Sequence, residues 1–234
     1  MYEILPEAPL RQLAQPFVEF YKLGGTNIQY YAETGTNISC LAFNNTEIQR
    51  GSPGEPTLGK QYQRNTHALV FTTGSLSCPP AVTRGLMAHE LAHIVKPYQS
   101  FPDPDYDETN DIYICERETD LLASFATSVD DLIALFEHGL AQHQTHEFMY
   151  AYAADRLKYL HIVKDIQHHH GLYNQPHASI DDLPIPLGFW KDLEQALLER
   201  DNSPQASCEA VQNIVAFLDE RKHTQQPSHE HTLS

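Results

Sequence analysis

The alternation of apolar and polar residues changes character along the chain. Residues 8–23 place apolar side chains three or four positions apart, which predicts an amphipathic helix. Residues 27–34 and 37–44 are short runs of β-forming residues separated by Gly35, and we expect them to form a β-hairpin. Residues 67–73 form a third apolar run that predicts another strand. The N-terminal third is therefore expected to hold one helix and a small sheet.

Helical periodicity replaces this mixed pattern after residue 79. Pro79 and Pro80 suit the first turn of a helix, where the missing N–H groups have no intrahelical partner to lose. We expect an α+β fold in which a small mixed sheet packs on the helix that starts here, followed by a mostly helical C-terminal half. The predicted helices cover 79–97, 112–126, 128–139, 146–168, 189–200 and 206–221, with an irregular proline-rich segment over 172–187.

Length and composition agree with one globular unit. The chain has 234 residues, of which 41% are hydrophobic and 20% charged, and this is enough to form one core. We predict a single domain over 1–222, made of a helix–strand part (1–75), a central helical part that carries the candidate site (79–143) and a C-terminal helical part (144–222). Residues 223–234 are polar and are expected to form a disordered tail.

Charge and targeting signals limit the partners of the chain. The formal net charge of −16 argues against binding to nucleic acid or to an anionic membrane, because both require a basic patch. No apolar run reaches the ~18–20 residues of a membrane-spanning helix, and the N-terminus lacks the features of a secretory signal. The four cysteines show no Cys-x-x-Cys spacing, so we expect reduced thiols. We expect a soluble, cytoplasmic protein by default; signal-independent export and the oligomeric state stay open.

The helix predicted over 79–97 carries the pattern His-Glu-x-x-His, formed by His89, Glu90 and His93. Residues four apart lie on one face of a helix, so the two imidazoles can bind a single Zn²⁺ ion. The neighbouring residues are mostly apolar, which is unusual around three polar side chains unless these have a function. The alternative interpretation is a helix that exposes a pair of histidines to solvent.

The next predicted helix supplies a third metal ligand. Glu116 and Asp120 are again four residues apart, so both can face the first helix. Glu116 is expected to bind the metal, while Asp120 accepts the second N–H of a ligating imidazole and so orients it. Glu118 points to the opposite side of the helix and is a poorer ligand. The alternative is a surface helix on which these acids form ion pairs with Arg117.

These two motifs resemble the gluzincin group of zinc metallopeptidases, in which His-Glu-x-x-His precedes Glu-x-x-x-Asp on the next helix. Within the group the chain is similar to the HtpX-like and CAAX prenyl endopeptidase family. The similarity lies in the strand-and-loop segment 70–76, the motif helix 87–94, the acidic motif 116–120 and the helix start at 128–135. It covers about residues 67–140. The ImmA-like group shares both motifs and is an alternative subfamily.

The resemblance implies a zincin-like fold and one Zn²⁺ ion per chain, held by His89, His93 and Glu116. It also implies that the metal polarises a water molecule and that Glu90 acts as the general base in the hydrolysis of a peptide bond. The expected function is therefore a zinc-dependent metalloendopeptidase with a protein or peptide substrate. Two alternatives stay open: a catalytically silent binding module with this fold, and a zinc hydrolase of a non-peptide substrate.

The substrate side of the site has no clear motif. The family carries a later Thr-His-Pro…Arg-Ile element, and the nearest segment here, 176–182, has its Pro and His in reverse order. Our candidates for the residue that stabilises the oxyanion are His177, His146, Tyr150 and Tyr113. The strand at 67–73 is a candidate edge for pairing with an extended peptide.

One further histidine cluster lies outside these motifs. His168, His169 and His170 end the helix predicted over 146–168. A run of histidines can bind metal, whereas imidazoles near a helix C-terminus are also favoured by the helix dipole. The sequence leaves both interpretations open.

Overall fold

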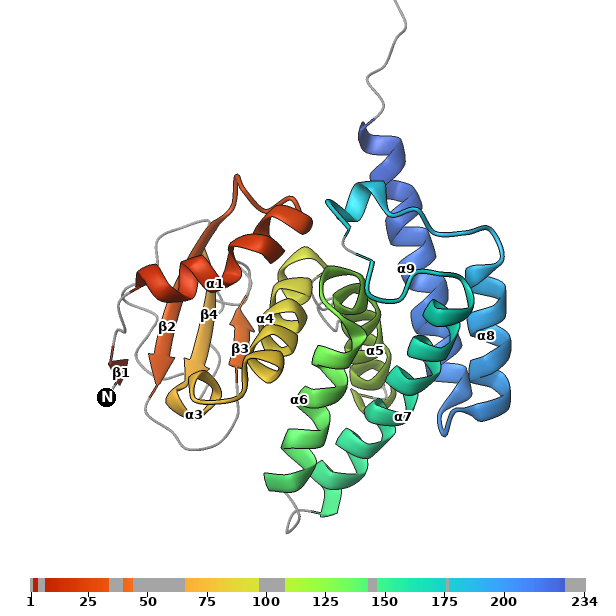
Figure 1. The fold of residues 1–234 in the computed structure, drawn as a ribbon, viewed down its shortest axis with the longest axis horizontal. Coiled ribbons are helices and arrows are strands. Elements are labelled where there is room, and N and C mark those ends of the chain that lie inside the picture. Colours follow the sequence, from red (N-terminus) through yellow and green to blue (C-terminus); the bar gives the residue numbers. More distant parts are fainter. Residues whose placement is uncertain are drawn as a thin grey trace, which may run out of the picture.

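A computed structural model of the chain describes residues 2–3, 7–33, 40–43, 66–96, 108–142, 147–175 and 177–225. It has the α+β character expected from the sequence, with a small sheet on one side, α4 beside it and α5 to α9 on the other side (Figure 1). The strands are β1 (Tyr2–Glu3), β2 (Asn27–Glu33), β3 (Cys40–Phe43) and β4 (Thr66–Thr72). The helices are α1 (Glu7–Phe20), α3 (Thr73–Leu76), α4 (Pro80–Val95), α5 (Glu108–Ala126), α6 (Val129–Gln142), α7 (Glu147–His169), α8 (Phe189–Arg200) and α9 (Pro204–Gln225), with a 3-10 turn η2 at Ile180–Asp182.

The sheet is mixed, but its strand order differs from the expected hairpin. The order is β1-β2-β4-β3, so β4 lies between β2 and β3 and pairs in parallel with β2 and antiparallel with β3. The prediction that 27–34 and 37–44 pair directly is therefore wrong. The physical reason lies in β4, where Ala68, Leu69, Val70 and Phe71 are all buried, and a continuous apolar strand suits the centre of a sheet.

This strand order also changes which strand lies at the free edge of the sheet. The strand at 67–73 was our candidate for pairing with an extended peptide, but β4 has a neighbour on each side. Among the strands that the structure describes, the edge nearest α4 is β3, and α4 packs against it. A substrate that adds a strand at this edge of the sheet would pair with β3.

The helices follow the sequence pattern with shifted ends. α4 begins with Pro80 in its first turn, as expected. α5 begins at Glu108, four residues before the predicted start, and α9 continues to Gln225, so the polar tail does not begin at residue 223 as predicted. Residues 226–234 lie outside the described part of the chain. No helix in the described ranges is long and apolar enough to cross a membrane.

The hydrophobic core surrounds α4. One cluster of buried residues runs from Leu10 in α1 to Leu218 in α9 and includes Met87, Ala88 and Leu91 of α4. These three residues are completely buried, and they explain the apolar sequence around the His-Glu-x-x-His motif. The helix is therefore held on several sides, which fixes the direction of the polar side chains it carries.

The closest contact of α4 is with the start of α6. A Cβ atom placed on Gly85 would lie 2.4 Å from the carbonyl oxygen of Asp131, so only glycine fits there. The next side chain in the same contact, Arg84, donates to both carboxylate oxygens of Asp131 at 2.9 and 2.7 Å. Thr127 donates to the same carboxylate at 2.6 Å. These contacts fix α4 against α6 one turn before the motif.

Candidate metal centre

Three potential metal ligands from two helices converge between α4 and α5. Nε2 of His89 lies 3.1 Å from Nε2 of His93 and 3.2 Å from Oε2 of Glu116. Nε2 of His93 lies 3.5 Å from Oε1 of Glu116. A tetrahedral zinc ion with bonds of about 2.0–2.1 Å to nitrogen and oxygen places its ligands about 3.3–3.4 Å apart. The spacing of the three side chains therefore fits one metal ion, and the group can hold one.

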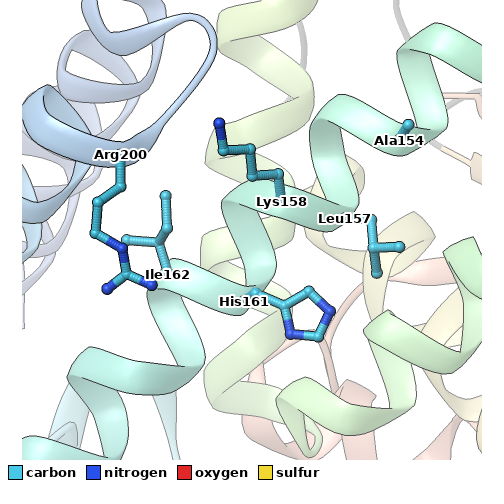
Figure 2. A pocket seen from close by; sticks show the side chains of 6 residues that line it. All are labelled: Ala154, Leu157, Lys158, His161, Ile162 and Arg200. Carbon is cyan, nitrogen blue, oxygen red and sulfur yellow. The ribbon is translucent and has the colours of Figure 1, made fainter.

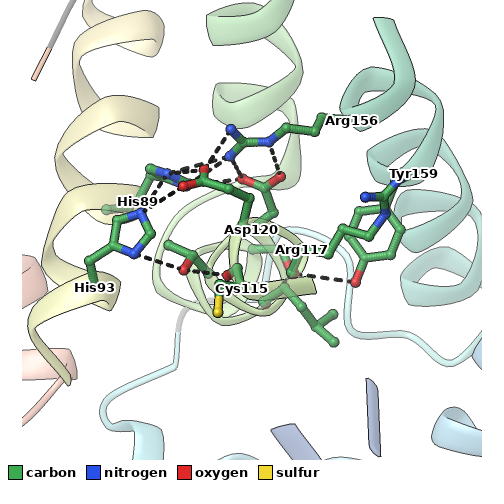
Figure 3. A network of polar contacts seen from close by, with 12 residues as sticks. His89, His93, Cys115, Arg117, Asp120, Arg156 and Tyr159 are labelled. Atoms are coloured by element: carbon green, nitrogen blue, oxygen red, sulfur yellow. Dashed lines mark hydrogen bonds and ion pairs between the residues drawn. The ribbon is translucent and has the colours of Figure 1, made fainter. Parts of the chain in front are cut away.

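The other ring nitrogen of each histidine is held by α5. Nδ1 of His89 lies 3.0 Å from Oδ1 of Asp120, the contact expected from the sequence (Figure 3). Nδ1 of His93 lies 3.2 Å from Oγ1 of Thr119, whose hydroxyl donates to the carbonyl oxygen of Cys115 at 2.8 Å. Because that hydroxyl proton is engaged, the Thr119 oxygen accepts from His93. Both imidazoles therefore carry their proton on Nδ1 and present Nε2 as a ligand.

Two nitrogen lone pairs that face each other at 3.1 Å repel unless a cation lies between them. Without a metal ion that cation is a proton. Burial opposes charge on either ring, but at His89 the hydrogen bonds with Asp120 and Glu116 outweigh burial and raise the pKa to about 9. At His93, burial and the positive charge of His89 lower the pKa to about 3. Besides the two Nδ1 protons, the histidine pair thus holds one further proton at its Nε2 atoms, where a metal ion fits.

A residue that the sequence analysis did not identify completes this centre. Arg156 of α7 is buried, and its Nη1 lies 2.7 Å from Oε2 of Glu116. Its Nε and Nη2 donate to the two carboxylate oxygens of Asp120 at 2.8 and 2.7 Å (Figure 3). Burial opposes ionisation of both acids, but the charge of Arg156 and the contact with His89 outweigh it and lower their pKa values. Both carboxylates are therefore available as anions.

The adjacent residues on α5 and α7 form a second buried ion pair. Arg117 is completely buried and pairs with Asp155, so two consecutive residues of α5 pair crosswise with two consecutive residues of α7. The rings of Tyr113 and Tyr159 lie 5.5 and 5.7 Å from the Arg117 guanidinium. The alternative of a surface helix with an exposed Arg117 ion pair is wrong for this segment, because Arg117, Glu118 and Asp120 are buried.

The poorer ligand, Glu118, points away from the centre as expected. It pairs with Lys96 at the end of α4 and accepts from Nδ2 of Asn213 in α9 at 2.6 Å. Glu90, our expected general base, is buried at 7% exposure beside His89 on α4. Its role as the general base stays a prediction.

The four residues that the sequence suggested for stabilising the oxyanion do not gather around the ligand group in the described part of the chain. His177 packs against Phe125, with ring centroids 6.3 Å apart, and Phe125 lies nine residues beyond Glu116, or about 13 Å along α5. The structure therefore does not bring His177 to the ligand group. His146 and the side chain of Tyr150 lie outside the described part. Tyr113 packs edge-on against Tyr152, with centroids 5.1 Å apart.

Tyr152 of α7 is the second residue that the sequence analysis missed. Its ring stacks near the Arg156 guanidinium, 5.4 Å from ring centroid to carbon. Burial raises the pKa of its phenol, and the nearby carboxylates Glu116 and Asp120 raise it further against the effect of Arg156. The phenol stays protonated and can donate a hydrogen bond. Tyr152 and Arg156 are four residues apart and so share one face of α7, but this spacing does not predict that the face packs on α5.

A cavity of about 360 Å³ lies elsewhere on α7 and does not include the ligand group. It is lined by apolar and basic side chains of α7 and by Arg200, the last residue of α8 (Figure 2). Its lining residues are Ala154, Leu157, Lys158, His161, Ile162 and Arg200. The cavity and the centre are therefore separate features of the same helix.

Comparisons with protein-family models, with curated proteins and with solved structures gave no match for this chain. Its function has to be argued from the geometry of its own side chains.

Proposed function

We propose that this chain is a zinc-dependent metalloendopeptidase of the gluzincin type, with His89, His93 and Glu116 as ligands of one Zn²⁺ ion. The observation that carries the proposal is the ligand spacing of 3.1, 3.2 and 3.5 Å between the three side chains, with both histidines held through Nδ1. We further propose that the sheet with α4 and α5 is a zincin-like arrangement, of either the HtpX-like or the ImmA-like kind.

A bound zinc ion supplies Lewis acidity, which polarises a carbonyl group and lowers the pKa of a water molecule toward about 7. Glu90 would serve as the general base that accepts a proton from water and as the general acid that protonates the leaving amine. Asp120 and Thr119 keep the imidazoles in the ligating tautomer. Tyr152 is our candidate donor to the developing oxyanion, because its phenol stays protonated in its buried position.

One observation favours a second candidate, a metal-binding module without catalysis. Nη1 of Arg156 lies 2.7 Å from the same Glu116 oxygen that faces His89, so a cation of the protein already balances the charge of this carboxylate. Such a centre could serve to hold the fold or a partner. The two candidates differ in what Glu90 does, because only hydrolysis needs a general base.

The deciding experiment compares the wild type with Glu90→Gln in a proteome digest. New N-termini should form with the wild type and disappear with Glu90→Gln, while zinc content stays the same because Glu90 is not a ligand. Glu137→Gln, which removes an exposed carboxylate from α6, serves as the matched control and should cleave like the wild type. Equal sets of N-termini from the wild type and Glu90→Gln would exclude the peptidase and favour the silent module.

A further inference from the structure

A second group of metal-binding side chains lies at the junction of α7 and α8. His169 ends α7, His170 follows it, and Asp192 belongs to the first turn of α8. One potential ligand atom of each residue lies within 4.8 Å of the others. This is the same histidine run that the sequence left undecided, and the structure adds a carboxylate from a second helix to it.

Two contacts link the members of this group. Nε2 of His170 lies 2.9 Å from Oδ2 of Asp192. The rings of His169 and His170 meet edge-on with centroids 5.0 Å apart, and the ring of His170 packs on Phe189 at 5.6 Å. His170 and Asp192 are thus already in contact, and a ligand atom of the exposed His169 lies within 4.8 Å of both.

The third histidine of the run takes no part in this group. His168 stacks on Tyr173 with ring centroids 3.6 Å apart and an interplanar angle of 22°. The group is therefore defined by two helices that meet, and not by a general excess of histidines. This difference supplies a matched control one residue away from the proposed ligands.

We propose that His169, His170 and Asp192 form a second, surface metal site for Zn²⁺ or another divalent transition-metal ion. Two imidazoles and one carboxylate are ligands that such ions accept, and Mg²⁺ and Ca²⁺ prefer an all-oxygen set. Nearly half of the Asp192 side chain is exposed, 45%, so water can complete the coordination. The ion would connect the end of α7 to the start of α8, across the segment 171–188, in whose described residues η2 is the only helical turn.

The experiment measures Zn²⁺ binding to the full chain at pH 7.5 after removal of metal with a chelator, by calorimetry and by competition with a chromophoric chelator. The wild type should bind one zinc ion more than His169→Ala. Loss of this ligand should weaken the site by more than the roughly 10–100-fold that loss of an outer partner costs. Zinc should also raise the melting temperature of the wild type more than that of His169→Ala.

Two further variants keep the test decisive. Asp192→Asn retains the shape of the side chain and should also weaken this site, whereas His168→Ala should bind zinc like the wild type. Equal binding by the wild type, His169→Ala and Asp192→Asn would overturn the proposal, and so would an equal loss in His168→Ala and His169→Ala. Because the readout is a difference between variants of this surface group, it does not depend on the centre at His89, His93 and Glu116.

Discussion

Nη1 of Arg156 lies 2.7 Å from Oε2 of Glu116, so a buried arginine of α7 contacts the carboxylate that completes the ligand group. The same guanidinium holds Asp120 through two further hydrogen bonds. The two acids on α5 are therefore oriented from two sides, by the histidines of α4 and by the arginine of α7. Removing Arg156 takes away the cationic partner that Glu116 and Asp120 share on the α7 side.

Arg156→Met should destabilise the metal-free protein strongly. The substitution keeps an apolar side chain of similar length but leaves Glu116 and Asp120 with His89 as their remaining cationic partner. Loss of one partner from a buried ion pair typically costs about 3–5 kcal/mol of unfolding free energy. Urea denaturation in the presence of a chelator measures this. The matched control is Arg200→Met, which removes a half-exposed ion pair with Asp165 and should cost less than about 1 kcal/mol. Equal losses in both variants would show that the buried cluster has no special role.

Thr119→Val should weaken metal binding with little change in the fold. Valine has nearly the same shape but cannot accept the Nδ1 proton of His93, so this imidazole is no longer held in the ligating tautomer. Loss of such an outer partner typically lowers metal affinity about 10–100-fold. Thr119→Ser retains the hydroxyl and should restore most of the affinity in a zinc competition assay. An unchanged affinity in Thr119→Val would contradict the proposed orientation of His93.

Metal binding should release about one proton per ion near neutral pH, because ligating imidazoles must be neutral. Besides its two Nδ1 protons, the metal-free histidine pair holds one proton that a metal ion displaces, since the pKa of His89 is about 9 and that of His93 about 3. The apparent metal affinity should therefore rise about tenfold per pH unit over the neutral range and level off above the pKa of His89. Calorimetry in buffers of different ionisation enthalpy counts the protons. A count near zero or near two would contradict the shared proton.

Gly85→Ala should destabilise the contact between α4 and α6. The new Cβ would lie 2.4 Å from a backbone oxygen, which cannot move away as a flexible side chain can. Overpacking of this kind typically costs about 1–3 kcal/mol. Gly139→Ala, on α6, is the control because a Cβ there meets nothing within 4 Å. It should stabilise the protein by up to about 1 kcal/mol through helix propensity. A neutral result for Gly85→Ala in thermal unfolding would show that the helices can separate at low cost.

Local patterns predicted most helices, because periodicity and proline placement act within one segment. Pro80 at the start of α4 and the apolar stripe of α8 are examples. The strand order could not be predicted in this way. The signal of Gly35 for a hairpin is local, whereas the position of β4 depends on burial of the run around Leu69 by distant helices. The end of α9 at Gln225 lies beyond the predicted end at residue 221, because residues 222–225 are polar and do not extend the apolar pattern of the helix.

The three potential metal ligands could be predicted from the sequence, whereas Arg156 of the same centre could not. The spacing of four residues fixes the face of a helix, so His89 and His93, and likewise Glu116 and Asp120, could be placed together before the structure was known. Arg156 could not be placed, because an arginine on an amphipathic helix is usually exposed and only the packing of α7 on α5 buries it. His177 failed as a candidate because sequence gives no distance between separate elements.

The most direct test of the proposed centre is the zinc content of purified chains carrying His169→Ala, which removes the surface site. We predict about one zinc ion per chain in this background. The same content should be found when Glu90→Gln is added, together with loss of peptide hydrolysis. It should fall to near zero when His93→Ala is added. A zinc content that His93→Ala leaves unchanged would contradict the assignment of His89, His93 and Glu116 as the metal ligands.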